Sequence, residues 1–417
     1  MNILIKSAKI IDSASSYHHT VKDILIKNGK IERIDNKINQ EEGFEVVEKQ
    51  NLHVSPGWFD SSVAFGEPGH EERETLENGL LVAALSGFTD VCLQPDLVPV
   101  TDTASQVSFL LSKTQGNAVK VHPVGALTKH LQSELLAELY DMKTAGAVMF
   151  GDYKSELKHA HLLKLALQYV SGFGGLVSSF PLDSALAIGG CVHEGLFSTE
   201  HGLSGMPVLS ETARITRDLH ILAYTGGKLH IPTISSEAAV KLIREAKKSG
   251  LDVSCSVSAH HLILLDQDIA DFDTDRKLLP PLREASDRQA LLDGLLDGTI
   301  DMITSDHCPM DIEQKRVEFD LAAFGSIGLE SVFGIANKLL PLEKTISLLT
   351  DASARFGLKP ALISEGQTAR LSLFDPDAVY VFDKSNIRSS VDNCAALGLS
   401  LQGRVYGIFG NNQLVVS

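Results

Sequence analysis

The chain has 417 residues, of which 44% are hydrophobic and 22% charged, so it can bury a large core and is neither disordered nor fibrous. Its 37 basic and 53 acidic residues give a net charge of -16, which argues against nucleic acid as a partner. The five cysteines are scattered and no apolar run reaches membrane-spanning length. We therefore expect a cytoplasmic protein that has no disulfide framework and does not enter a membrane.

Both ends of the chain show the alternation of β-strands. The first 52 residues alternate polar and apolar side chains, and Asn28-Gly29 predicts a tight hairpin turn. The alternation returns near the C-terminus in ARLSLFDPD and GRVYGIFGNNQLVV. We expect residues 1–52 and 366–417 to build one composite β-sandwich domain, and residues 53–365 to form a second domain.

Short apolar runs alternate with amphipathic stretches in the larger domain, which is typical of βα units and a parallel sheet. Eight strands are expected, at residues 58–65, 88–95, 119–127, 147–152, 175–180, 228–234, 251–258 and 300–306. The stretch SSEAAVKLIREAKKSG predicts a helix with Ser235 or Ser236 as N-cap and Gly250 as its end. Eight strands favour an α/β fold of the (β/α)8 type, a TIM-like barrel, over an open doubly wound sheet.

Several motifs lie in and between these expected strands, some of them at the C-terminal strand ends, where a barrel carries its chemistry. They are PGWFD, AFGEPG, QPDLVPVTDT, SVSAHHLILLD, LLPPLR, DGTIDMITSDHCP and FGSIGLE. Together they resemble dihydroorotase, a family of the amidohydrolase superfamily, over nearly the whole chain. The resemblance implies a zinc-dependent hydrolase that opens or closes the dihydroorotate ring in pyrimidine biosynthesis.

The zinc ligands that this resemblance implies are mostly missing. The family's four histidine positions hold side chains that cannot bind zinc, namely Ser62, Ala64, Ser179 and Thr233. The bridging position after strand four falls near Asp152 or Tyr153, and Asp306 keeps the aspartate of strand eight. Because hydroxyl and methyl groups cannot replace imidazole, we expect no metal, with Asp152 and Asp306 as the residual candidates.

The substrate anchors that the family implies are missing as well. Gly66 stands where the family has arginine, Asp96 replaces an asparagine, and Met310 replaces a histidine. We therefore expect no substrate-binding residues at these three positions. Asp306 keeps its carboxylate at a catalytic position without a nucleophile to activate, so we expect it to pair with His307 or a lysine, or to have a raised pKa.

Other polar residues near the strand ends are interpreted as structural. His260, His261, Asp306 and Cys308 could in principle rebuild a metal site, but four ligands must converge closely, so we favour a bracing role for the histidines. Lys154 lies beyond the expected position of a bridging lysine, and we expect it to be an exposed loop residue.

These observations favour a dihydroorotase-like protein that is catalytically inactive and acts as a structural or regulatory subunit. The resemblance implies aspartate transcarbamoylase as a partner, in a homo- or hetero-oligomer. The alternative is an active dihydroorotase, or another cyclic amidohydrolase that cleaves a cyclic amide C–N bond, with zinc in an atypical site. A third hypothesis is a sensor that binds a small ligand in the barrel mouth.

Overall fold

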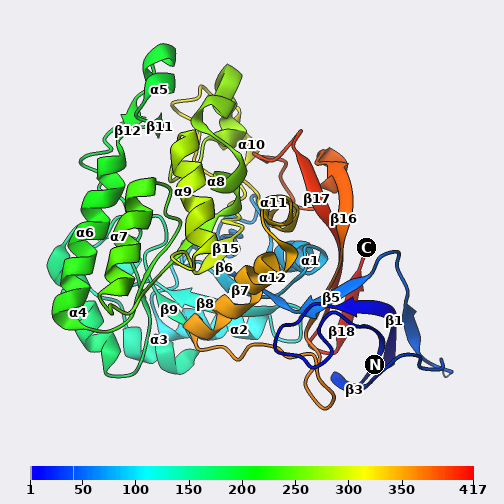
Figure 1. Ribbon diagram of the computed structural model, residues 1–417. Coiled ribbons are helices and arrows are strands. Elements are labelled where there is room, and N and C mark those ends of the chain that lie inside the picture. The colour runs from blue at the N-terminus through cyan, green and yellow to red at the C-terminus, as the bar shows by residue number, and fades with distance from the viewer. Residues whose placement is uncertain (1, 41) are drawn as a thin grey trace.

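The computed structural model describes residues 2–40 and 42–417, and a closed parallel barrel is its largest unit (Figure 1). Its strands are β6 (Trp58–Val63), β7 (Phe88–Leu93), β8 (Lys120–Gly125), β9 (Met149–Phe150), β10 (Val177–Ser178), β13 (Leu229–Ile231), β14 (Val253–Ser258) and β15 (Met302–Thr304). They pair in chain order from β6 to β15. The backbone N–H of Ala64 donates to the carbonyl oxygen of His307 at 2.8 Å, which joins β6 to β15. The barrel is confirmed, and the open sheet is wrong.

Every expected barrel strand is present, but most are shorter than the apolar runs suggest. The run expected at residues 147–152, for example, is a strand only at Met149–Phe150. The runs extend beyond the strands at both ends, and at the C-terminal edge of the sheet the chain turns with positive φ angles at Gly66 (116°), Tyr153 (54°), Thr233 (46°) and Asp306 (50°). These turns direct the loop side chains that form the barrel mouth.

Helices surround the barrel strands (Figure 1). They are α1 (Leu76–Leu85), α2 (Ala104–Lys113), α3 (Leu139–Ala145), α4 (Ala160–Ser171), α6 (Val208–Thr225), α7 (Glu237–Lys248), α9 (Ala285–Leu296), α11 (Val332–Leu339) and α12 (Leu342–Thr350). In α7 the Ser236 hydroxyl accepts a hydrogen bond from the Ala239 N–H at 3.2 Å, so Ser236 is the N-cap. Gly250, with φ of 80°, follows the C-cap residue, as expected from the sequence.

Smaller elements are inserted into the connections. They are β11 (Val192–His193), α5 (Leu196–His201), β12 (Gly205–Met206), α8 (Ala259–Ile263), α10 (Ile312–Lys315) and five 3-10 helices at Lys129–Leu131, Asp266–Phe272, Thr274–Arg276, Asp351–Phe356 and Lys384–Asn386. The strands β11 and β12 form a small parallel sheet of their own. With α5 they project at the top of Figure 1, beyond α6.

A second, mixed sheet is built from both ends of the chain. It contains β1 (Asn2–Ile10), β2 (Val21–Lys27), β3 (Lys30–Asp35), β4 (Glu45–Val47), β5 (His53–Pro56), β16 (Leu371–Val381), β17 (Ser400–Gly410) and β18 (Gln413–Val416). The two ends meet where β5 pairs with β16 in antiparallel register. The expected shared sheet is therefore confirmed, whereas the domain boundaries at residues 52 and 366 stay a prediction.

A buried aromatic cluster joins the second sheet to the base of the barrel. The Trp58 ring, at the start of β6, lies 4.6 Å from the Phe333 ring and 5.5 Å from the Phe374 ring between centroids. Its indole N–H donates to the Ser55 hydroxyl at 2.9 Å, so the buried polar atom is satisfied. This packing fixes the base of the barrel and leaves its C-terminal end for a site.

In the described part of the chain, no helix is both long enough and apolar enough to cross a membrane.

Candidate functional site

The C-terminal ends of the barrel strands surround a small cavity, and most of the residues that line it are polar. Its lining residues are Ser61, Ser62, Gln94, Met149, Tyr153, Lys154, Ser178, Phe180, His230, Pro232, Thr233 and Asp306. The cavity volume is about 10 Å³, which holds about one water molecule. Of the positions singled out in the sequence, five line this cavity, so the barrel does bring them together: Ser62, Tyr153, Lys154, Thr233 and Asp306.

The four positions of the family's histidine ligands offer no metal donor in the structure. Ser62 and Thr233 present hydroxyl groups to the cavity, and Ala64 is buried with only a methyl group. Ser179 turns toward α6, where its hydroxyl donates to Asp218 Oδ2 at 2.5 Å. Burial raises the pKa of Asp218 to about 6, although this hydrogen bond and a neighbouring arginine oppose the shift. The Ser179 hydroxyl thus satisfies a buried carboxyl group.

The most informative contact at the barrel mouth is an ion pair between Lys154 and Asp306. Lys154 Nζ lies 2.8 Å from Asp306 Oδ2, and the side chains are 13% and 4% exposed. The expectation of an exposed loop lysine is therefore wrong. Tyr153 has a left-handed backbone after β9 and precedes this lysine, whose Nζ lies 5.4 Å from the centre of the Tyr153 ring. Asp306 pairs with a lysine, as one of the stated expectations required.

Burial and charge act in opposite directions on this pair. Burial lowers the pKa of Lys154, but the Asp306 carboxylate outweighs it and leaves the pKa raised. Burial also raises the pKa of Asp306, and the lysine reverses only part of that shift. We conclude that Lys154 stays protonated at neutral pH and supplies the positive charge that the buried carboxylate needs.

Asp152, the other residual carboxylate, braces a loop. Its Oδ1 accepts hydrogen bonds from the backbone N–H groups of Leu127 (2.8 Å) and Thr128 (2.9 Å). The Thr128 hydroxyl donates to Oδ2 as well, and burial raises the pKa of this carboxyl group. Since these bonds use both oxygens to hold the loop after β8, Asp152 does not join Asp306 at the cavity.

The three anchor positions also differ from what a carboxylate substrate needs. A Cβ added at Gly66 would lie 2.5 Å from the carbonyl oxygen of His70, so an arginine does not fit there without rearrangement. Asp96 is half-buried, its Oδ1 is shielded from solvent, and burial raises its pKa. Met310 lines a different surface hollow, so the three positions provide no common binding site.

The paired histidines after β14 and the histidine after β15 are buried structural residues. Burial lowers the pKa to about 3 for His260 and to about 4 for His261 and His307. His261 Nε2 donates to the carbonyl oxygen of Pro280 at 3.1 Å, and His307 Nδ1 accepts from the N–H of Gly328 at 3.2 Å. Across residues 2–40 and 42–417, none of the three belongs to a group of side chains close enough to hold a metal ion.

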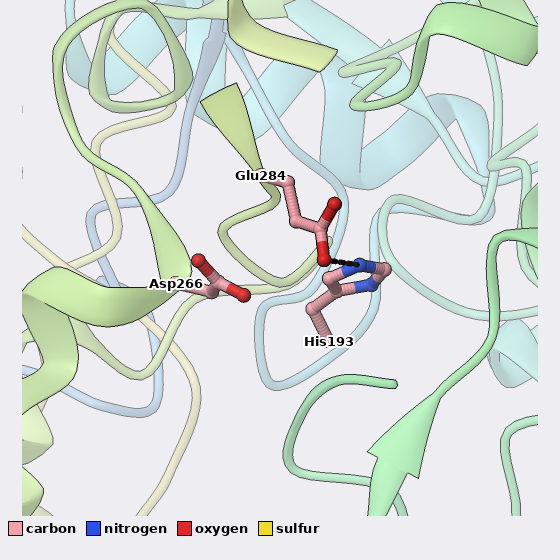
Figure 2. A group of neighbouring side chains, drawn as sticks. All are labelled: His193, Asp266 and Glu284. Carbon is pink, nitrogen blue, oxygen red and sulfur yellow. Dashed lines mark ion pairs between the residues drawn. The ribbon is translucent and has the colours of Figure 1, made fainter. Parts of the chain in front are cut away.

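One group with that property does exist (Figure 2), and none of its members lines the cavity. It joins His193 at the end of β11, Asp266 at the start of a 3-10 helix, and Glu284 at the N-cap of α9. Their donor atoms all lie within 4.8 Å of one another. Burial lowers the pKa of His193 to about 4, and the positive charge of Arg283 contributes to this shift, so the ring is neutral at neutral pH. The expectation that the chain binds no metal is therefore not supported.

Sequence reasoning missed several of these residues. Lys154 was judged by its distance from an expected motif, although the unpaired charge of Asp306 was a signal that a cation must lie nearby. Gln94 and His230 line the cavity without belonging to any expected ligand position. The His193 group carries no sequence signal, because its members are far apart in the chain.

Comparisons with known proteins agree with this architecture. Residues 52–239 match a family model described as Dihydro-orotase-like. A protein named dihydroorotase from Pelotomaculum thermopropionicum is 37% identical over 423 residues, covering 100% of this chain and 99% of its own. A second protein named dihydroorotase, from Desulforapulum autotrophicum, is 37% identical over 414 residues, which cover 97% of this chain and 96% of that protein.

Among solved structures, an L-hydantoinase (dihydropyrimidinase) from Arthrobacter aurescens superposes with a TM-score of 0.86, covering 100% of this chain and 96% of its own. At 22% identity, that likeness concerns the fold. The two full-length relatives, together with the matched family model, establish the relationship more closely. The chain belongs to the dihydroorotase family of the amidohydrolase superfamily.

Proposed function

We propose that this chain is a dihydroorotase-family protein whose barrel mouth does not perform metal-assisted hydrolysis, and that it acts as a structural or regulatory subunit in pyrimidine biosynthesis. The ion pair between Lys154 and Asp306 carries this proposal. The ammonium nitrogen of Lys154 lies 2.8 Å from the carboxylate of Asp306, which lines the cavity. The strand-end carboxylate is therefore already compensated by a cation that belongs to the chain.

The residues at the mouth do not fit a zinc ion. Zinc requires three or four nitrogen, sulfur or oxygen donors at about 2.0–2.3 Å, and Ser62, Ala64 and Thr233 supply hydroxyl or methyl groups instead. A doubly charged ion about 4 Å from the Lys154 ammonium would be repelled by about 8 kcal/mol at an effective dielectric of about 20. Without a bound ion, no group at the mouth generates hydroxide at neutral pH.

A subunit role needs a folded surface and does not need chemistry at the mouth. The helices around the barrel and the composite sheet are folded in the described part of the chain, so they offer surfaces that can support association in a homo- or hetero-oligomer. Aspartate transcarbamoylase is the partner that the family resemblance suggests, and the proposal places the assembly in the cytoplasm. Purifying the chain under native conditions tests this part, because a transcarbamoylase should co-purify with it.

An active cyclic amidohydrolase is the second candidate, and the relatives favour it. Proteins named dihydroorotase match this chain at 33% to 37% identity over nearly its whole length. Hydrolysis of a cyclic amide C–N bond would then depend on an atypical site that includes Asp306. The relatives thus favour an enzyme, whereas the side chains at the mouth favour a protein without this activity.

One experiment separates the two candidates. Dihydroorotase turnover is measured on the purified full chain with added zinc, and bound metal is quantified in the same sample. If the chain is an inactive subunit, no turnover is expected, whatever amount of metal is bound outside the barrel mouth. Turnover that disappears in the Asp306→Ala variant would overturn the proposal and establish the second candidate.

A further inference from the structure

We propose that His193, Asp266 and Glu284 form a binding site for a divalent transition-metal ion such as zinc, separate from the barrel mouth. Their donor atoms lie within 4.8 Å of one another, and His193 Nε2 is 3.9 Å from Glu284 Oε1 (Figure 2). This inference goes beyond the proposed function, since none of the three residues lines the mouth cavity.

The donor set suits such an ion. One imidazole nitrogen and two carboxylate oxygens make a three-ligand site in which water completes the coordination. Ligands at about 2.1 Å from a tetrahedral ion lie about 3.4 Å apart, so the three side chains have to move closer together. The Glu284 side chain is 52% exposed and can make that movement with little change in packing.

Asp266 gives a second, independent reason to infer a cation. This residue is only 7% exposed, and its Oδ1 accepts a hydrogen bond from the N–H of Gln267 at 2.8 Å. In the described part of the chain, its Oδ2 has no hydrogen-bond donor and no lysine, arginine or histidine forms an ion pair with it. This oxygen keeps contact with solvent, so it is free to bind a cation that enters from there.

The local backbone leaves room for the ion. Gly195 follows β11, and a Cβ added there would lie 3.2 Å from Glu284 Oε1 and 3.4 Å from His193 Nε2. Its φ of -170° is extended, so conformational freedom does not explain a glycine at this position. The absence of a side chain keeps the space in front of two donor atoms open.

Arg283 limits the affinity of this site. Its Nη1 donates to His193 Nδ1 at 2.8 Å, so the neutral ring holds its proton on Nε2, which faces Glu284. When an ion binds Nε2, the ring stays neutral only if its one proton moves from Nε2 to Nδ1 by exchange through solvent, so Arg283 must release Nδ1. The carbonyl oxygen of Met206 already accepts from the same Nη1 at 2.9 Å and lies within reach of the His193 ring. It can therefore accept the Nδ1 proton, as a backbone carbonyl commonly does for a metal-bound histidine.

A bound ion would join three segments that are distant in sequence: the small β11–β12 sheet, the 3-10 helix after α8, and the start of α9. The ion would therefore have a structural effect, because a ligand that binds only the folded chain raises its melting temperature.

The test uses the full chain after treatment with a chelator. Zinc is titrated against a chromophoric competitor, and the melting temperature is measured with and without zinc. The site variant is Glu284→Gln, and Glu194→Gln is its control, because Glu194 is exposed and adjacent to His193 but outside the group. A third variant, Lys154→Met/Asp306→Asn, removes the ion pair and the carboxylate at the mouth while leaving no unpaired charge.

We expect one zinc ion per wild-type chain, at least about tenfold weaker binding in Glu284→Gln, and wild-type binding in the other two variants. The zinc-dependent rise in melting temperature should disappear only in Glu284→Gln. A wild-type chain without bound zinc would overturn this inference and leave the proposed function standing. Zinc that is lost only in the mouth variant would overturn both, and zinc retained by all variants would place the ion elsewhere and overturn the inference alone.

Discussion

Replacing Lys154 with methionine should destabilise the chain strongly and in a pH-dependent way. Methionine keeps most of the side-chain volume but removes the charge, and the Asp306 side chain, 4% exposed, cannot regain water. The carboxyl group will then take up a proton. Protonating an aspartate with a reference pKa of about 3.9 costs about 4 kcal/mol at pH 7, which limits the loss, and breaking a buried pair typically costs about 3–5 kcal/mol. We therefore expect the free energy of unfolding to fall by about 3–4 kcal/mol at pH 7.

The sign of the pH dependence follows from the pKa of Asp306, which is raised already and rises further in the variant. A carboxyl group with a raised folded-state pKa contributes stability below its unfolded pKa and loses that contribution as the pH rises. The loss in Lys154→Met should thus shrink to about 1.5 kcal/mol at pH 5. At that pH, protonating the buried carboxyl group costs much less.

Urea unfolding of the wild type and Lys154→Met at pH 5 and pH 7 measures this effect. Lys158→Met is the control, because Lys158 is exposed, and its change should stay within about 0.5 kcal/mol. Adding Asp306→Asn to Lys154→Met should restore much of the stability, since the buried charge is then gone. A Lys154→Met variant as stable as the control, or a loss equal at both pH values, would refute the assignment of Lys154 as the cation for Asp306.

Three further predictions concern the barrel. Gly57→Ala should cost about 1–3 kcal/mol, because the new Cβ would lie 2.2 Å from Thr89 Oγ1; calorimetry should show a lower melting temperature that Thr89→Ala partly restores. Lowering the pH from about 6.5 toward 4 should reduce the urea midpoint of unfolding. His260 and His307 have folded-state pKa values of about 3 and 4, so in this pH range their rings take up protons only in the unfolded chain, which stabilises that state. A constant midpoint would contradict their burial as neutral rings. The single tryptophan, Trp58, is 0% exposed, so its fluorescence should shift to longer wavelength on unfolding, and an unchanged emission maximum would contradict its burial.

The barrel could be predicted because its determinants are local in sequence. Nearly every residue of the barrel strands is buried, so these segments are rich in apolar and small side chains, and helices such as α7 carry their own cap and stop residues. The segment from β11 to β12 could not be found in this way. Its strands have two residues each, and β11 lies between glycine and charged residues in GGCVHEG, without a longer apolar run such as the AVMF that marks the equally short β9.

The site was predictable only where it depends on side-chain type. The identities of Ser62 and Thr233 were enough to expect that neither of these two positions presents an imidazole to the barrel mouth. Both residues line the cavity. The direction of Lys154 was not predictable, because it depends on the left-handed turn at Tyr153, and a single sequence does not reveal such a turn at a non-glycine residue. His193 and its two neighbours meet only through tertiary packing.

Charge balance connects the missing ligands with the lysine that was misjudged. A carboxylate at the end of β15 is buried, so it requires a cation or a proton whatever the function of the chain. A bound ion can supply that charge only if other side chains also hold the ion, and Ser62, Ala64 and Thr233 cannot. Keeping Asp306 without these ligands therefore calls for a cation attached to the chain itself, and the Nζ of Lys154 lies 2.8 Å away in that role. Without the lysine, Asp306 would have to bind a proton instead, so electrostatics links the role of Lys154 to the absence of the zinc ligands.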